Sequence, residues 1–86
     1  MSLAEDIMAE VGALRRAVHD QTTLITGFLR TNRDAMDMVR QGLAGSRNGY
    51  DQEMLAILNQ TEESLTSSAA DLQRAATALE RVENSI

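Results

Sequence analysis

Apolar side chains recur at heptad spacing through the first half of the chain. With Ala4 placed at position a, nine of the twelve a and d positions over six heptads are apolar. The a positions hold Ala4, Val11, Val18, Ile25, Asn32 and Val39, and the d positions hold Ile7, Leu14, Gln21, Phe28, Ala35 and Gly42. A repeat kept this long is typical of an amphipathic helix. We therefore predict a helix over about residues 3–44, begun by Ser2 and Glu5 as a capping box.

The apolar surface of this predicted helix is wider in its second half. Beside the a and d positions it carries further large side chains at Leu24, Leu29, Met36, Met38 and Leu43. A narrow apolar seam satisfies one neighbour, whereas a wide one is typical of a helix that contacts two. Residues 24–43 are therefore expected to face both the second helix and another chain. Met36, Met38 and Met54 are expected to pack in the core rather than to form a binding surface.

Two polar residues interrupt the first seam. Asn32 at an a position is either a buried amide that fixes the helix register, at a cost in stability, or a partly wet position without that role. Gln21 at a d position is expected to be a second polar break in the same seam.

A dense turn signal separates the first helix from the second. Residues 42–49 contain three glycines and end in Asn48-Gly49. Gly45 is expected to end the first helix in a left-handed conformation, with Arg40 placed favourably for the helix dipole. A connection of about 4–6 residues places the two helices side by side and antiparallel.

A leucine ladder runs through the second half of the chain and predicts a helix over about residues 50–83. With Leu58 at position a, the a positions hold Leu58, Leu65, Leu72, Leu79 and Ile86. The d positions are mostly small and hold Met54, Thr61, Ser68, Ala75 and Val82. Small side chains let a neighbouring backbone come close. This helix is acidic, so its carboxylates either steer pairing with the arginines of the first helix or only keep the surface hydrated.

Composition indicates how such a hairpin is completed. The 86 residues form one domain, 1–86, with no cysteine, one histidine and 2% aromatic residues. Disulfides and thiolate metal sites are therefore excluded, and oligomerisation is the remaining way to stabilise so small a core. The predicted fold is all-α, an antiparallel two-helix hairpin that assembles as a dimeric four-helix bundle. The hairpin or dimer interface is predicted to contain Val18, Ile25, Phe28, Leu29, Met36, Val39, Leu58, Leu65, Leu72 and Leu79.

Charge and candidate chemistry narrow the function classes. A net charge of −5 argues against nucleic acid as a partner, and no apolar run is long enough for membrane insertion. His19 beside Asp20 is expected to be a solvated surface histidine, because adjacent helix positions point in different directions. Carboxylate pairs such as Glu62-Glu63 lack the histidines of a di-metal site. We predict no catalytic, cofactor or metal site, so the chain is not expected to be an enzyme.

The layout of the chain resembles the Trp-X-Gly family of small secreted proteins, the early-secreted-antigen-like proteins of type VII secretion systems. The likeness covers the whole chain, as a cysteine-free helical hairpin with a glycine-bearing turn near its middle. The stretch that matches the family's turn motif is Arg47-Asn48-Gly49, which keeps the glycine and has no tryptophan. The family's C-terminal Tyr-x-x-x-Asp/Glu pattern has no counterpart, because the only tyrosine is Tyr50 and Met54 stands four residues after it. Gly49 is the one motif position carried over.

The resemblance implies a non-enzymatic protein that acts through helix–helix pairing, as a secreted substrate or a co-secreted partner. It implies a homodimer or heterodimer with a similar hairpin, a larger secreted effector as a further partner, and export by the type VII route. The acidic stretch from Met1 to Asp6 lacks the basic and apolar regions of a Sec signal peptide. All eight basic residues are arginine, which favours a high-GC, actinobacterial source. The alternatives are a cytoplasmic coiled-coil adaptor or chaperone and a structural assembly subunit.

Overall fold

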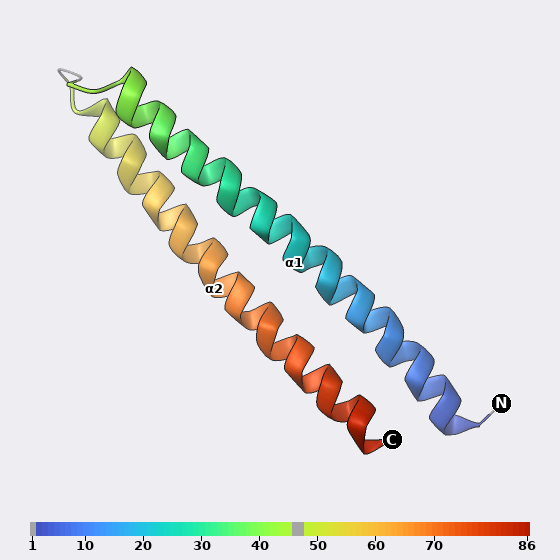
Figure 1. Cartoon of the computed structure of the whole chain (residues 1–86). Coiled ribbons are helices and arrows are strands. Elements are labelled where there is room, and N and C mark those ends of the chain that lie inside the picture. The colour runs from blue at the N-terminus through green and yellow to red at the C-terminus, as the bar shows by residue number, and fades with distance from the viewer. Residues whose placement is uncertain (1, 46–47) are drawn as a thin grey trace.

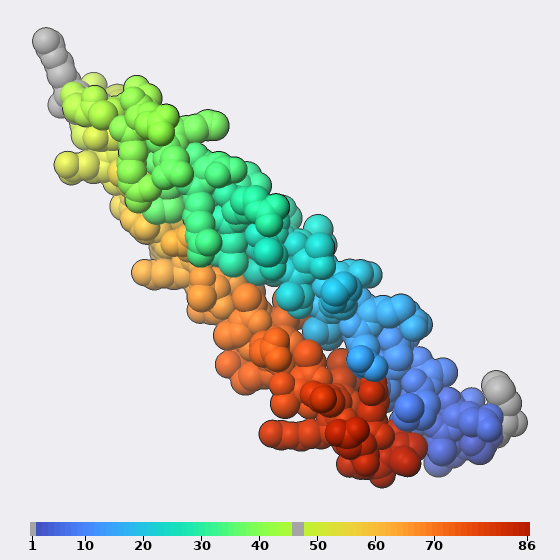
Figure 2. Space-filling model, in the orientation of Figure 1, coloured from blue at the N-terminus to red at the C-terminus, as the bar shows by residue number. Residues whose placement is uncertain are grey.

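The protein is a rod made of two antiparallel α-helices that lie side by side (Figure 1). A computed structural model describes residues 2–45 and 48–86. Helix α1 spans Leu3–Gly42, helix α2 spans Tyr50–Ser85, and the principal extents of the rod are 68 × 14 × 13 Å. The predicted all-α hairpin is confirmed. Figure 2 shows that the rod is one helix pair thick, so each helix keeps an uncovered side.

Both predicted C-terminal helix ends differ from the structure by two residues. α1 ends at Gly42 rather than at residue 44, because Leu43 leaves the helical region with φ −116° and ψ 11°. α2 continues to Ser85 rather than ending at residue 83, because no glycine or proline stops it there. The Ser85 hydroxyl donates to the Arg81 carbonyl over 2.8 Å within this last turn.

Ser2 caps the start of α1, which confirms one half of the predicted capping box. The Glu5 amide donates to the Ser2 hydroxyl over 3.2 Å, and Ser2 itself is extended, with φ −80° and ψ 156°. Glu5 and Asp6 lie in the first turn, where carboxylates face the positive end of the helix dipole. Arg40 lies in the last turn of α1, where the dipole favours a cation.

Glycine sets the backbone on both sides of the turn. Gly45 and Gly49 have φ of 75° and 68°, in the left-handed region that residues with a Cβ avoid. The predicted left-handed conformation of Gly45 is confirmed, although α1 already ends at Gly42. Gly49 is the N-cap residue of α2, and its carbonyl accepts from the Glu53 amide over 3.0 Å.

The helices meet through positions a and e of the two heptads rather than through a and d. In α2, every half-buried side chain except those of Ser68 and Thr77 is at a or e. In α1 the buried side chains are those of Val11, Asn32, Met36 and Val39, all at a or e, and the half-buried exceptions at d are Ile7 and Ala35. The e positions are favourable because they carry apolar side chains at Leu29, Met36, Leu55, Ala69 and Ala76. The hydroxyls at d of α2 would instead lose water on burial.

Asn32 is a buried amide tied to the opposite helix rather than a wet seam position. It is the polar residue among those that the structure describes as buried, with 7% of its surface exposed. Its amide nitrogen donates to the Leu58 carbonyl of α2 over 2.9 Å and lies 3.7 Å from the Met36 sulfur. Gln21, predicted to be a second polar break in the seam, is exposed instead, because its d position faces outward.

Candidate interaction surface

Large apolar side chains gather outside the seam, at positions d and g. Among the described residues, twelve large hydrophobic side chains are exposed, and nine of them are at d or g. These nine are Leu3, Leu14, Leu24, Phe28, Met38, Tyr50, Met54, Ile57 and Val82. The other three, at a or e near helix ends, are Met8, Leu43 and Ile86. We call the surface formed by the d and g positions of both helices the d/g face.

The d and g positions of α1 and α2 lie on the same side of the hairpin. Leu24 and Phe28 of α1 line one shallow groove together with Ser68 and Asp71 of α2. The groove has a volume of about 380 Å³. This follows from the seam: antiparallel helices that meet through the same two heptad positions turn their remaining matched positions to one side. The d/g face is therefore continuous across the two helices.

Large side chains are unevenly distributed over the d/g face. α1 presents large side chains in the middle of the rod, where Leu24 is 58% and Phe28 54% exposed. At the same level α2 presents the shorter polar side chains of Ser64, Ser68 and Asp71. Its large exposed side chains at d and g lie nearer the turn, apart from Val82 near the open end. The face therefore has a ridge on α1 beside a hollow on α2. Over the residues that the structure describes, neither helix contains an apolar stretch long enough to cross a membrane.

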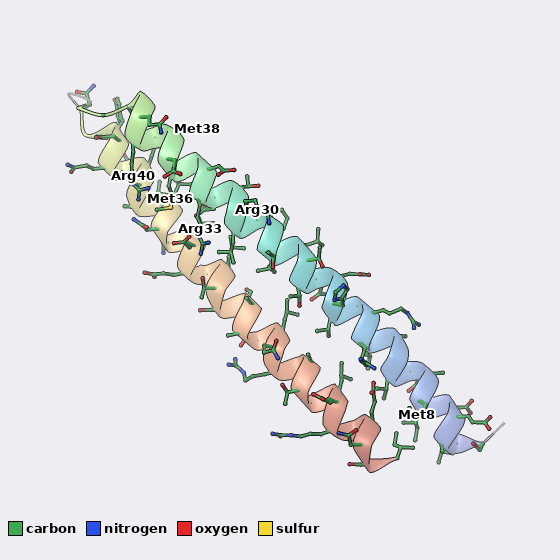
Figure 3. All side chains as sticks on the ribbon, viewed as in Figure 1. Met8, Arg30, Arg33, Met36, Met38 and Arg40 are labelled. Atoms are coloured by element: carbon green, nitrogen blue, oxygen red, sulfur yellow. The ribbon has the colours of Figure 1, made fainter. Side chains whose placement is uncertain are left out.

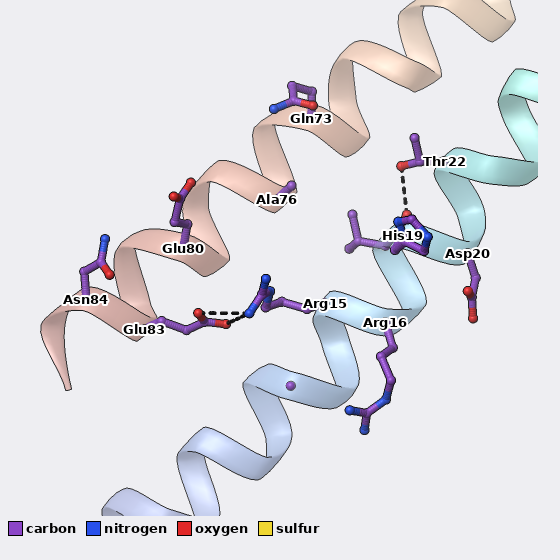
Figure 4. A pocket seen from close by; sticks show the side chains of 12 residues that line it. Arg15, Arg16, His19, Asp20, Thr22, Gln73, Ala76, Glu80, Glu83 and Asn84 are labelled. Carbon is purple, nitrogen blue, oxygen red and sulfur yellow. Dashed lines mark hydrogen bonds and ion pairs between the residues drawn. The ribbon is translucent and has the colours of Figure 1, made fainter.

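The opposite side of the hairpin is polar and carries ion pairs between the helices. Arg15 Nη1 lies 3.0 and 3.1 Å from the two Glu83 carboxylate oxygens, as Figure 4 shows. Arg33 Nε lies 2.9 Å from Glu62 Oε1. These contacts join arginines of α1 to carboxylates of α2. Such contacts are what we expect if the acidic residues of α2 steer its pairing with α1. The arginine side chains are 61% and 69% exposed, so each pair contributes at most about 1 kcal/mol.

A wider hollow lies on this polar side, toward the open end of the hairpin. It has a volume of about 790 Å³, and Arg16, His19, Glu80 and Asn84 are among the residues that line it. Figure 4 shows these side chains spread around the hollow without converging on one point. His19 is exposed, as the sequence predicts. Within the described residues, no three His, Asp or Glu side chains are grouped so as to hold a metal ion.

Nine of the ten side chains predicted for the hairpin or dimer interface lie in the seam. Met36 and Val39 are buried, and those half-buried at a or e are Val18, Ile25, Leu29, Leu58, Leu65, Leu72 and Leu79. Phe28 is the exception, since its d position places it on the d/g face.

The methionines near the turn divide between the seam and the d/g face. Figure 3 shows Met36 between the helices and Met38 on the outer side of α1. Met38 and Met54, expected to pack in the core, are 66% and 43% exposed. The expectation was wrong for these two because Met38 at g and Met54 at d lie on the side of the helices that faces away from the seam.

The predicted turn motif is described in part. Asn48 is exposed and Gly49 supplies the left-handed N-cap of α2, while Arg47 lies outside the described residues. The glycine carried over from the resemblance therefore stands where the backbone conformation favours glycine.

Sequence reasoning missed parts of both surfaces. The predicted interface omits Val11, which is 5% exposed, and Leu55, which is half-buried at an e position. It also omits Tyr50 and Ile57, which belong to the α2 half of the d/g face. The signal was their spacing of three and four residues around Met54, which continues a helical stripe at positions g and d.

No family model, no characterised protein and no solved structure matches the chain. Its function is therefore argued from the geometry of the d/g face.

Proposed function

We propose that this protein acts by helix–helix pairing, with its d/g face covered by another helical hairpin in a four-helix bundle. The observation that carries the proposal is the placement of the exposed large hydrophobic side chains, nine of twelve of which lie at d or g. Large exposed hydrophobic side chains gathered on one side of a protein are typical of interaction sites, because monomeric proteins rarely leave large apolar patches uncovered. The other side of the hairpin, with its ion pairs, is suited to face water.

The exposed area of the chain supports this proposal. The accessible surface is 6558 Å², whereas a compact monomer of 9.4 kDa exposes about 5000 Å². The excess of roughly 1500 Å² is larger than the ~800 Å² that each partner buries in a standard interface. The rod therefore has enough surplus surface for an interface of ordinary size.

The use of heptad positions is that of one half of a bundle. In a four-helix bundle, positions a and d face the centre, while e and g flank the two neighbouring helices. Here a and e are used within the hairpin, and nine large hydrophobic side chains at d and g are left exposed. A second pair of helices would cover the d and g positions and complete the bundle.

Light scattering at micromolar concentration tests the pairing, with an expected mass near twice 9.4 kDa. Phe28→Asp puts a charge in the middle of the d/g face and is expected to leave the mass of one chain. Thr23→Asp adds the same charge at an exposed f position and is the matched control, expected to keep the wild-type mass. If Phe28→Asp also loses helix by circular dichroism, the mass still separates it from Thr23→Asp.

One result would refute the pairing proposal. A wild-type chain that has the mass of a monomer and melts cooperatively, at a temperature independent of concentration, would be complete without a partner. The d/g face would then be ordinary surface.

The pairing is further proposed to serve type VII secretion, with the protein as a secreted substrate or a co-secreted partner of a similar hairpin. The support is the resemblance in layout to the Trp-X-Gly family, together with the left-handed Gly49 at the matching turn position. Proteomics of culture supernatants from the host, with and without a functional type VII ATPase, tests this. Export that depends on the ATPase is expected, and retention in the cell pellet of both strains would contradict it.

A further inference from the structure

The d/g face also indicates which hairpin covers it. We propose that the occupant is a second copy of this chain, with both turns at the same end, so that α1 of each copy lies over α2 of the other. This inference rests on the proposed function, namely that a hairpin covers the face. It adds the identity of that hairpin and its orientation.

Two identical hairpins can cover each other's d/g faces around a two-fold axis in two ways. An axis parallel to the rod puts the two turns together and sets α1 of one copy over α2 of the other. An axis across the rod puts the turns at opposite ends and sets α1 over α1 and α2 over α2. The side chains of the face distinguish these two arrangements.

The shape of the face fits the arrangement with the turns together. Leu24 and Phe28 of α1 lie at the same level as Ser68 of α2, because they line one groove. With the turns together, Phe28 of one copy lies over the groove at Ser68 and Asp71 of the other, so a large side chain meets a hollow lined by shorter ones. With the turns apart, large side chains of the two α1 helices meet each other, and the serines of the two α2 helices face each other across a gap. Close packing favours the first arrangement.

The same match continues toward both ends of the rod. The ion pairs between the helices fix the level of α1 against α2, and same-end copies keep this level. Near the turn, Met38 of one copy then meets Met54 and Ile57 of the other. Near the open end, Leu14 meets Val82. Each exposed large side chain of α1 in this region therefore finds an apolar side chain or a hollow.

The charges along the outer edges of the face favour the same arrangement. At c positions the edge of α1 carries Asp20 and Asp34, and the edge of α2 carries Arg74 and Arg81, all exposed. Asp20 is level with Arg74, because Asp20 lines the same hollow as Gln73, the residue next to Arg74. With the turns together, Asp20 of each copy faces Arg74 of the other. With the turns apart, the α1 edge that carries Asp20 and Asp34 lies along the same acidic edge of the other copy, and the α2 edge that carries Arg74 and Arg81 lies along its own counterpart.

The size of the face suits a dimer of two such chains. A face 68 Å long and 14 Å wide offers roughly 900 Å² on each copy, close to the ~800 Å² of a standard interface. Arg74 contacts Asp71 of its own helix, yet 73% of its side chain stays exposed. It is therefore accessible to a carboxylate of a second copy.

Pulsed electron paramagnetic resonance tests the orientation on the full chain. The chain has no cysteine, so Gln41→Cys places one spin label per copy at an exposed position in the last turn of α1. With the turns together, the two labels are expected about 25–35 Å apart, and with the turns apart about 45–55 Å, from the helix rise per residue. Dilution with unlabelled chain should remove the signal and is the control for contacts within one dimer.

A charge reversal at the edge gives results of opposite sign for the two arrangements. With the turns together, Asp20→Arg faces Arg74 and is expected to raise the dimer Kd about threefold to tenfold at low salt. The double variant Asp20→Arg with Arg74→Asp should return to the wild-type Kd. With the turns apart, Asp20→Arg lies along the acidic α1 edge of the other copy and lowers the Kd. Glu63→Arg makes the same change in net charge at an exposed f position and is the reference for this comparison.

Each remaining outcome rejects a defined part of the inference. Distant labels, or a Kd below that of Glu63→Arg, would overturn the orientation while leaving helix pairing in place. A chain that stays single alone but pairs with a different hairpin would overturn the second copy as the occupant. Neither result would refute the proposed function, which fails only if the hairpin is complete by itself.

Discussion

Asn32 offers a direct test of how the two helices are aligned. Its amide donates to the Leu58 carbonyl over 2.9 Å, and only 7% of its surface is exposed. Leu58 lies inside α2, where its carbonyl also has the amide of Glu62 as its helical partner. Asn32→Ala therefore removes one hydrogen bond and the volume of an amide group without leaving a backbone group unpaired.

The expected loss in free energy of unfolding for Asn32→Ala is the sum of three contributions. A hydrogen bond of this kind contributes about 1 kcal/mol net, and the small cavity costs about 1 kcal/mol more. The better helix propensity of alanine offsets about 0.5 kcal/mol. Asn32→Ala is therefore expected to lower the free energy of unfolding by about 1–2 kcal/mol. Asn32→Asp should lose more, because a buried carboxylate cannot donate to the Leu58 carbonyl.

Urea unfolding followed by circular dichroism measures this loss. The protein concentration must be the same for all variants, because pairing makes the midpoint depend on it. Asn59→Ala is the matched control, since Asn59 is exposed on α2 and reports the gain in helix propensity alone. If Asn32→Ala and Asn59→Ala had equal free energies of unfolding, the buried amide would not hold the two helices, and the reasoning would be wrong.

Two further predictions concern the turn and the polar side. Gly45→Ala should lower the free energy of unfolding by about 1 kcal/mol, because Gly45 has φ 75°. Gly27→Ala should raise the free energy of unfolding by about 0.5–1 kcal/mol, since the added methyl meets no atom within 4 Å. Melting temperatures of Gly45→Ala and Gly27→Ala that shift in the same direction would contradict this contrast. Arg15→Ala should lower the free energy of unfolding by less than about 1 kcal/mol, through loss of the pair with Glu83. This difference should shrink in about 1 M salt, and a salt-independent loss in denaturant titrations would indicate packing instead of charge.

The helices and their pairing could be predicted from the sequence, but not which side chains enter the seam. Phe28 and Leu29 are adjacent and apolar, and heptad spacing is compatible with either one facing α2. Leu29 enters because α2 offers apolar side chains at a and e, whereas Thr61 and Ser68 at d would bury hydroxyls. That choice depends on residues far along the chain, so no window of local sequence contains it.

The alignment of the helices was predictable only in part. A polar residue in the middle of an apolar seam indicates a special role, and Asn32 has one. Its acceptor, the Leu58 carbonyl, could not be predicted, because every residue of a helix presents a similar carbonyl. The d/g face of α1 was foreseeable from the wide apolar surface over residues 24–43, whereas its α2 half depended on g positions such as Ile57.

The contacts between the helices join residues at very different separations along the chain. Asn32 and Leu58 are 26 residues apart, whereas Arg15 and Glu83 are 68 apart. Closing the longer loop costs about 0.9 kcal/mol more in chain entropy, so the hairpin is expected to form from the turn toward the termini. The first half of α1 leaves the ribosome early, yet the part of α2 that covers it is synthesised last. The first half of α1 is therefore the part of the hairpin that stays longest without its neighbouring helix.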